Sequence, residues 1–259
     1  MGLIIFAICL AASTIGGICG IGGGVIIKPV LDALGVMSVS SISFLSGLSV
    51  LSMSVVSMIK QRKSHLVELR TGSLLAVGAV LGGIAGNAIF QQLKALTADQ
   101  LVGMVQAIVL AIITILTLVY SAFLRSRLPS YQVKNAPATV LLGMLMGVLS
   151  AFLGIGGGPI NLAILYFAFS MDTKKAAANS LYIIMFSQAA SFLTSCLQRT
   201  IPEFKLIYLV LMVSAGILGG MLGSKVNKRI SAATTDKLFA GLLLVIVFIC
   251  FYNAWRFAP

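Results

Sequence analysis

Charged side chains are scarce in this chain: they make up 9% of its 259 residues, and only 6 are acidic. A soluble domain of this size needs a far more polar surface to stay dissolved. Hydrophobic residues make up 59%, and apolar runs long enough to cross a bilayer recur along the whole sequence. These runs do not alternate as barrel strands do, so the sequence predicts an all-α, polytopic integral membrane protein.

Residues that bind metals or attack substrates are equally scarce. The chain has one histidine, His65, in a basic loop, and its 4 cysteines lie in apolar segments without the spacing of a metal site. No carboxylate stands in the middle of an apolar span, and Asp32 falls near the end of a short one. We therefore expect no enzyme activity, cofactor, metal or carboxylate-driven antiport.

The net charge of +12 is concentrated in short loops between the apolar runs. This is the pattern of cytoplasmic loops in a membrane protein, which argues against nucleic-acid binding. The first residues, MGLIIFAICLAAS, lack the basic region of a cleaved signal peptide. We expect a multi-pass protein of the cell inner (cytoplasmic) membrane whose partners are the lipid bilayer and a small substrate, with homo-oligomerisation left open.

The chain contains two copies of one unit. The run Gly20-Ile21-Gly22-Gly23-Gly24 returns as Gly154-Ile155-Gly156-Gly157-Gly158, 134 residues later. Further matches follow at offsets of 134 to 137: Ser46 with Ser180, Glu68 with Glu203, Gly82-Gly83 with Gly219-Gly220, Gly86 with Gly223, and Asp99 with Asp236. Such duplication is typical of secondary transporters. It predicts a first transmembrane repeat at 1–126, a cytoplasmic linker at 127–136 and a second repeat at 137–259.

Each unit starts with an apolar stretch that the glycines interrupt, at 3–34 and 137–169, and three clean spans follow. One helix of about 32 residues would reach about 48 Å, too long for a core of about 30 Å, whereas two crossings need about 40 residues. A helix, a glycine break and a shorter helix fit the length of each stretch. This pair of helices either crosses the membrane once or turns back to the side from which it entered. Re-entrant pairs place 13 Lys and Arg on one side against 4, whereas crossing pairs divide them 10 to 7. The positive-inside rule therefore favours two inverted repeats, each a broken, re-entrant helix pair plus three transmembrane helices.

The paired glycine motifs, each opening a short helix in a duplicated unit, resemble the TauE/SafE sulfite-exporter family of membrane permeases. The resemblance covers nearly the whole chain, and its most specific parts are Val25-Ile-Ile-Lys-Pro29 and Pro159-Ile-Asn161-Leu after the glycines. It implies an anion permease for sulfite, sulfonates or related organosulfur anions. The second motif differs from the first at Leu162, which stands where the first motif has Lys28. A cationic side chain that attracts the anion could therefore come from the first half only.

The glycines at 22–24 and 156–158 are the first candidates for substrate binding: Gly22, Gly23, Gly24, Gly156, Gly157 and Gly158. Without Cβ atoms they let the chain turn sharply and let a ligand approach the backbone. The helices that follow present unpaired N–H groups and a partial positive charge, a ready anion site. The alternative is that these glycines only allow close helix packing. A dinucleotide-binding loop is excluded because no strand precedes either motif.

Lys28 is the one basic residue well inside an apolar stretch, and burying its charge is costly. Its ammonium group would attract an anion, or it would reach an interface or pair with Asp32, four residues on. The sequence leaves these alternatives open.

The spans after the breaks supply polar candidates. Ser46 and Ser180 rank first because they match across the repeat, and the amides of Asn161, Asn179 and Gln188 come next. Packing between helices is the competing explanation for serines in membrane helices. The pairs Gly82-Gly83 and Gly219-Gly220, with Gly86 and Gly223, are interpreted as packing positions. Valine at Gly143, in an uninterrupted helix, is expected to be milder than valine at Gly23 or Gly157.

These observations predict a secondary transporter of small anions that works by alternating access, with the substrate at the two broken-helix N-termini. An anion channel is the main alternative. An intramembrane enzyme would need a nucleophile–base set or a metal site in the spans. A structural scaffold gives no reason for duplicated helix breaks.

Overall fold

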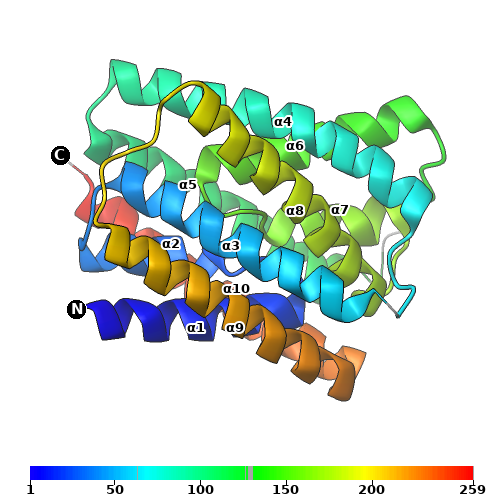
Figure 1. Ribbon diagram of the computed structural model, residues 1–259. Helices are drawn as coiled ribbons and strands as arrows, with labels where there is room; N and C mark the ends of the chain where they lie inside the picture. The colour runs from blue at the N-terminus through cyan, green and yellow to red at the C-terminus, as the bar shows by residue number, and fades with distance from the viewer. Residues whose placement is uncertain (63, 126, 128–130, 259) are drawn as a thin grey trace.

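The computed structural model describes residues 1–62, 64–125, 127 and 131–258, and in this part of the chain it is all-helical, without strands (Figure 1). The elements are α1 (Gly2–Cys19), α2 (Gly24–Leu34), α3 (Val39–Gln61), α4 (Leu69–Leu96), α5 (Asp99–Val119), a π-helical turn η1 (Tyr120–Leu124), α6 (Ala136–Leu153), α7 (Pro159–Phe169), α8 (Thr173–Leu197), α9 (Leu206–Arg229) and α10 (Ala232–Arg256). Eight helices are long and apolar enough to cross a membrane. The all-α, polytopic prediction is confirmed.

The two short helices are the ones that follow the glycine motifs. Helices α2 and α7 have 11 residues each, so each reaches about 16 Å and cannot cross a bilayer core of about 30 Å. The helices before them, α1 and α6, end at Gly20 and Gly154, both in the left-handed conformation that ends helices and favours glycine. Both interrupted stretches are therefore a long helix, a glycine break and a short helix.

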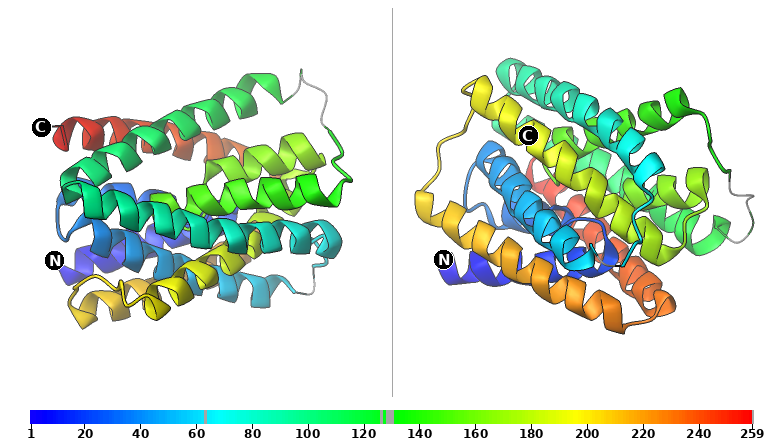
Figure 2. Two further views of the ribbon diagram at one scale, coloured as in Figure 1. Left: turned by 90° about the horizontal axis from the view of Figure 1, so that it is seen from above. Right: turned by 45° about the vertical axis from the view of Figure 1, so that its right-hand side comes forward.

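The loops gather at two ends of the molecule (Figures 1 and 2). At one end, the Ser41 hydroxyl donates to the Glu203 carbonyl at 2.8 Å, and the Arg256 guanidinium donates to the Asp32 carbonyl at 2.7 Å. Both chain termini also lie at this end (Figure 1). The loop after α2 is on the same side as Met1, so α1 and α2 form a hairpin that leaves where it enters.

The opposite end carries most of the basic loops. Lys228 Nζ donates to the Lys60 carbonyl at 2.8 Å, and Lys174 Nζ donates to the Asn227 carbonyl at 2.5 Å. The backbone N–H of Tyr131, just before α6, donates to the Phe167 carbonyl at the end of α7 at 2.8 Å. The α6–α7 pair therefore also turns back, but from this end. Which end faces the cytoplasm stays a prediction.

The halves are interlocked through glycines. Gly86 of α4 packs its Cα against the Val148 carbonyl of α6, and Gly223 of α9 packs against the Thr14 carbonyl of α1. Thr14 and Val148 are themselves 134 residues apart, so one contact is made twice with the halves exchanged. The packing role inferred for these glycines agrees with the structure. The inverted symmetry and the repeat boundaries stay predictions, and part of the linker at 127–136 lies outside the described residues.

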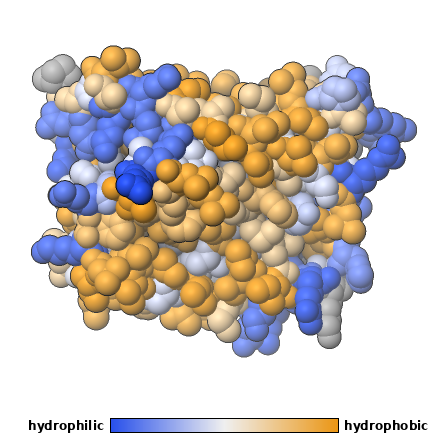
Figure 3. All heavy atoms as spheres, turned by 45° about the horizontal axis from the view of Figure 1, so that its top comes forward, coloured by the Kyte–Doolittle hydropathy of each residue, from blue (hydrophilic) through white to orange (hydrophobic). Residues whose placement is uncertain are grey.

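The surface fits a lipid environment. Figure 3 shows hydrophobic side chains over the middle of one face and hydrophilic ones gathered toward both ends. Large apolar side chains such as Leu116, Phe248 and Trp255 are exposed by 63%, 73% and 76%. A protein with so many exposed apolar side chains would not stay dissolved in water. In a membrane, the hydrocarbon core of the bilayer covers these side chains.

Candidate functional site

The two glycine breaks meet in the interior of the molecule. Gly24, the first residue of α2, has no room for a Cβ because the Ile155 carbonyl lies directly against it. A Cβ at Gly22 would stand 3.1 Å from the Gly156 carbonyl, and one at Gly157 would stand 3.3 Å from the Ile21 carbonyl. The structure therefore brings together the two motifs that the sequence singled out, backbone against backbone.

The glycines are needed here for their conformation as well as their size. Gly22, Gly156 and Gly157 have φ angles of 79°, 67° and 127°, a region that residues with a Cβ rarely adopt. Gly23 and Gly158 are the residues that precede α2 and α7. In α2 the N–H groups of Gly24 and Val25 precede the first intrahelical bonds, which leaves them free for a ligand.

Helices α3 and α8 present matching faces to the breaks. On α3, Ser43 packs against Gly154 and Val50 against Gly156. On α8, Ala177 packs against Gly20 and Ile184 against Gly157. These four residues are two pairs at the repeat offset of 134, so repeat-matched residues of α3 and α8 pack against the breaks.

Ser46 and Ser180 lie on these two faces. Ser46 follows Ser43 by three residues and precedes Val50 by four, which places it on the same side of α3. Ser180 has the same relation to Ala177 and Ile184 on α8. Both serines are 0% exposed, and neither hydroxyl has a hydrogen-bond partner. A buried hydroxyl without a partner costs roughly 1–3 kcal/mol, so the two repeat-matched serines offer unused hydrogen-bonding capacity beside the breaks.

Asn161 adds a polar group in the first turn of α7. It is 1% exposed, and its side-chain oxygen Oδ1 has no partner. Sequence reasoning missed Ser13 of α1, which is fully buried, packs against Gly23 and has an unpartnered hydroxyl. It also missed the apolar pair Val50 and Ile184, although their matching offset and shared β-branched type were available signals.

One cavity approaches the breaks from the end that carries the chain termini. It has a volume of about 50 Å³ and runs from Lys94 and Thr200 past Ser43 to Gly154 and Gln188. The Gln188 side chain donates from Nε2 to the Ser150 hydroxyl at 3.1 Å. Gln188 therefore lies on the wall of a cavity that reaches one break.

A second cavity lies at the basic end. It measures about 260 Å³ and is lined by Gln61, Ser64, Leu66, Lys174, Asn227 and Lys228. Asn227 Nδ2 donates to the Ile18 carbonyl at 2.5 Å, two residues before the first break begins. The molecule thus has a cavity toward each end, and the buried side chains of Val50 and Ile184 pack against the glycines of the breaks.

Asn179 lies apart from the breaks. Its Oδ1 accepts from the Glu68 backbone N–H at 3.2 Å, and its Nδ2 donates to the carbonyls of Leu66 at 3.1 Å and Lys175 at 2.8 Å. With these bonds made, the amide holds the loop between α3 and α4 against α8. We leave Asn179 out of the site that the remaining candidates form.

Lys28 is buried and paired. Its Nζ lies 2.6 Å from Asp32 Oδ2, and the side chains are exposed by 4% and 6%. Of the alternatives that the sequence left open, the structure has the i, i+4 ion pair. Asp32, which the sequence placed near the end of a short span, is a buried carboxylate.

Comparisons with known proteins agree with this architecture. The family model described as "Sulfite exporter TauE/SafE" matches residues 5–249. The probable membrane transporter protein YunE of Bacillus subtilis (strain 168) is 25% identical over 117 residues, which cover 45% of this chain and 41% of that relative. No solved structure matches. Since the family model spans nearly the whole chain, this multi-pass protein belongs to the TauE/SafE sulfite exporter family of membrane transporters.

Proposed function

We propose that the protein carries a small anion of the sulfite or sulfonate class across the cytoplasmic membrane by alternating access. The observation that supports this best is the meeting of the two glycine breaks beside Ser46 and Ser180, whose hydroxyls have no partner. A tetrahedral oxyanion needs several donors around it. Helix N–H groups and hydroxyls provide these donors without adding negative charge.

The substrate site in this proposal consists of both breaks and the side chains around them. It takes in Gly22, Gly23, Gly24, Gly156, Gly157 and Gly158 with Ser46, Ser180 and Asn161. Gln188 lines the cavity that reaches one break from the end of the molecule that carries the chain termini. An anion held by N–H groups of both halves stays at one site while the halves move around it, which is how discontinuous helices serve other transporters.

Alternating access is favoured over a channel by how the centre is filled. The two cavities lie toward opposite ends and share no lining residue, while the buried side chains of Val50 and Ile184 pack against the breaks. A carrier keeps its site closed to one side at a time, whereas a channel needs a continuous path. In the inverted arrangement 13 Lys and Arg share one side, which favours the cytoplasm on that side. We infer no enzyme activity for the chain.

Binding and transport test the proposal separately. Purified protein is tested for binding of sulfite, sulfate, methanesulfonate and 2-aminoethanesulfonate, with thermal stabilisation as the readout. Reconstituted vesicles then report uptake of a bound anion. A carrier saturates and shows counterflow when the vesicles are preloaded with unlabelled anion. Uptake without saturation or counterflow supports a channel, and binding of none of these anions refutes the substrate class.

A further inference from the structure

The buried ion pair of α2 lies beside polar atoms that have no hydrogen-bond partner, which a purely structural ion pair does not require. Lys28 and Asp32 form the buried pair, while the other two ion pairs among the described residues are at least 31% exposed on each side. Removing two charges from water costs several kcal/mol per ion in a protein, and only good geometry with further hydrogen bonds repays it. Here Asp32 Oδ1 has no partner, so the pair is incompletely satisfied.

Two further acceptors beside the pair also have no donor: Gln106 Oε1 on α5 and Asn253 Oδ1 on α10. The orientation of both amides is fixed because their nitrogens donate to backbone carbonyls, which can only accept. Gln106 Nε2 donates to Phe152 at 2.6 Å, and Asn253 Nδ2 donates to Pro29 at 2.8 Å. Gln106 and Asn253 are exposed by only 2% and 1%.

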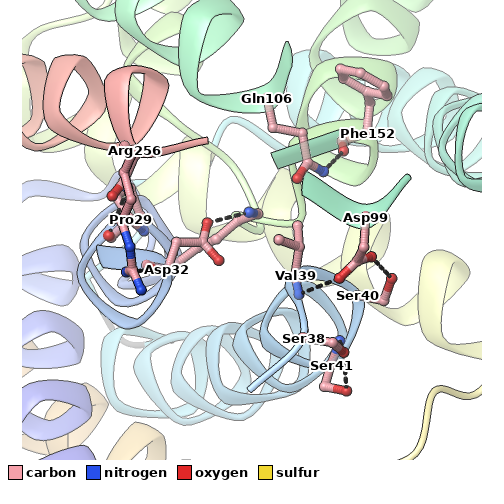
Figure 4. Close-up of polar contacts among 12 residues, drawn as sticks. Pro29, Asp32, Ser38, Val39, Ser40, Ser41, Asp99, Gln106, Phe152 and Arg256 are labelled. Atoms are coloured by element: carbon pink, nitrogen blue, oxygen red, sulfur yellow. Dashed lines mark hydrogen bonds and ion pairs between the residues drawn. The ribbon is translucent and has the colours of Figure 1, made fainter. Parts of the chain in front are cut away.

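These acceptors share one small cavity. It measures about 10 Å³ and is lined by Lys28, Asp32, Gln106 and Asn253, with Leu153 on the side of the second break. A space of this size holds about one water molecule. The site therefore consists of a carboxylate and two amide oxygens that need hydrogen-bond donors. The carboxylate and the Gln106 amide are drawn in Figure 4.

The neighbouring charges favour a proton over a metal cation as the missing donor. Lys28 contributes one positive charge from α2, and Arg256 of α10 adds another where it donates to the Asp32 carbonyl at 2.7 Å. Asp99 of α5 is engaged elsewhere, because it accepts from Val39 N and Ser40 Oγ at 2.9 Å each (Figure 4). The thiol of Cys250 also lines the cavity. A third full positive charge would be repelled here, whereas a proton on Asp32 creates an O–H group with acceptors beside it.

We propose that Asp32 takes up one proton each time the protein binds its anion, so that the two move together. The inference rests on the proposed function. A hydronium ion from the terminal end gives its proton to the carboxylate, which forms one O–H bond and leaves a water molecule. Neutral Asp32 then no longer holds the Lys28 ammonium.

The geometry of α2 directs the released Lys28 toward the substrate. In a helix the Cα–Cβ bonds tilt toward the N-terminus, so a lysine bonded to an aspartate four residues later reaches against its natural direction. Once released, its relaxed direction is back toward Gly24, one turn earlier, where α2 meets the second break. The anion then gains a cation without any other charge moving into the membrane.

Proton uptake on anion binding tests the proposal. The purified full chain is kept in weakly buffered detergent with a pH-sensitive dye, and methanesulfonate is added, because it does not itself take up protons near neutral pH. We expect up to one proton taken up per anion bound. Affinity should fall about tenfold per pH unit where free Asp32 is deprotonated. Asp32→Asn should remove both effects, while Glu68→Gln, at a part-exposed ion pair, should keep them.

Infrared spectroscopy separates this proposal from the transport proposal. On acidification the wild-type protein should develop the carbonyl band of a buried protonated carboxyl group, and Asp32→Asn should lack it, whether or not an anion binds. Absence of that band, or unchanged proton uptake in Asp32→Asn, overturns the proposal. If Asp32→Asn does not fold, Lys28→Met combined with Asp32→Asn removes both charges and serves as the test variant. Failure of every anion to bind, with the band present, refutes the proposed function alone.

Discussion

Gly24→Ala is the substitution that tests the meeting of the two breaks most directly. Any Cβ at this position collides with the Ile155 carbonyl, which belongs to the break of the other half and is backbone. The collision cannot be relieved by a side-chain rotation, so the second break must move away from α2. An anion held between the breaks then loses hydrogen bonds from one half.

The size of the effect follows from those lost bonds. Hydrogen bonds to a charged group contribute about 1.5–3 kcal/mol each, so losing one weakens binding by about 30-fold, at 1.4 kcal/mol for every factor of ten. Methanesulfonate binding to purified Gly24→Ala measures this directly, and counterflow in vesicles shows whether transport falls in parallel. Thermal unfolding confirms that the variant is folded.

The matched control is Gly241→Ala in α10. A Cβ there meets nothing within 4 Å, and alanine stabilises a helix interior by about 1 kcal/mol relative to glycine. Binding should be unchanged. Gly143 does not serve this purpose, because a Cβ there would collide with the Leu75 carbonyl of α4. The packing therefore gives no reason for valine at Gly143 to be milder than at the breaks. If folded Gly24→Ala binds and transports as well as Gly241→Ala, the anion does not sit between the breaks.

Three further variants separate binding from packing. Ser46→Ala and Ser180→Ala should each weaken anion binding about tenfold without lowering the unfolding temperature, since neither hydroxyl is bonded; loss of stability with unchanged binding would instead support a packing role. Asn179→Ala should lower the unfolding temperature, because it leaves the Leu66 carbonyl and the Glu68 N–H unpaired, while the folded fraction binds normally; weakened binding would return Asn179 to the site. Cysteines introduced at Ser64 and Ser231 should label from the same, cytoplasmic side, and labelling from opposite sides refutes the inverted arrangement.

The sequence was sufficient to predict the membrane class and the two breaks. Length and apolar character set the helices, and the glycine runs at an offset of 134 marked where α1 and α6 end. A substrate held at both broken-helix N-termini requires the breaks to face each other, and Gly24 does pack on the Ile155 carbonyl of the other break. How closely the two backbones approach, with no room for a Cβ, depends on tertiary packing that the sequence does not show.

For other residues the sequence did not show the surroundings, because these are tertiary. Asp32 stands near the end of a short helix, and the sequence did not show that α5 and α10 bury it to 6% exposure. Asn179 looked like a ligand because an amide in lipid needs a partner, and the partner proved to be the loop at Leu66 and Glu68. In both cases the residue type indicated that the side chain needs a polar partner, but the sequence did not show which residues surround it.

The two halves share a scaffold but differ in charge at one pair of positions. Lys28 and Asp32 of α2 correspond, at the offset of 134, to Leu162 and Tyr166 of α7. Tyr166 has the Arg125 guanidinium 3.9 Å from its ring centroid, and among the described residues of this half no carboxylate is buried. Without a coupled proton, a carrier moves its anion down the electrochemical gradient of that anion alone. If a single proton site lies in α2, near the end with the chain termini, the direction of net movement also depends on the pH difference across the membrane.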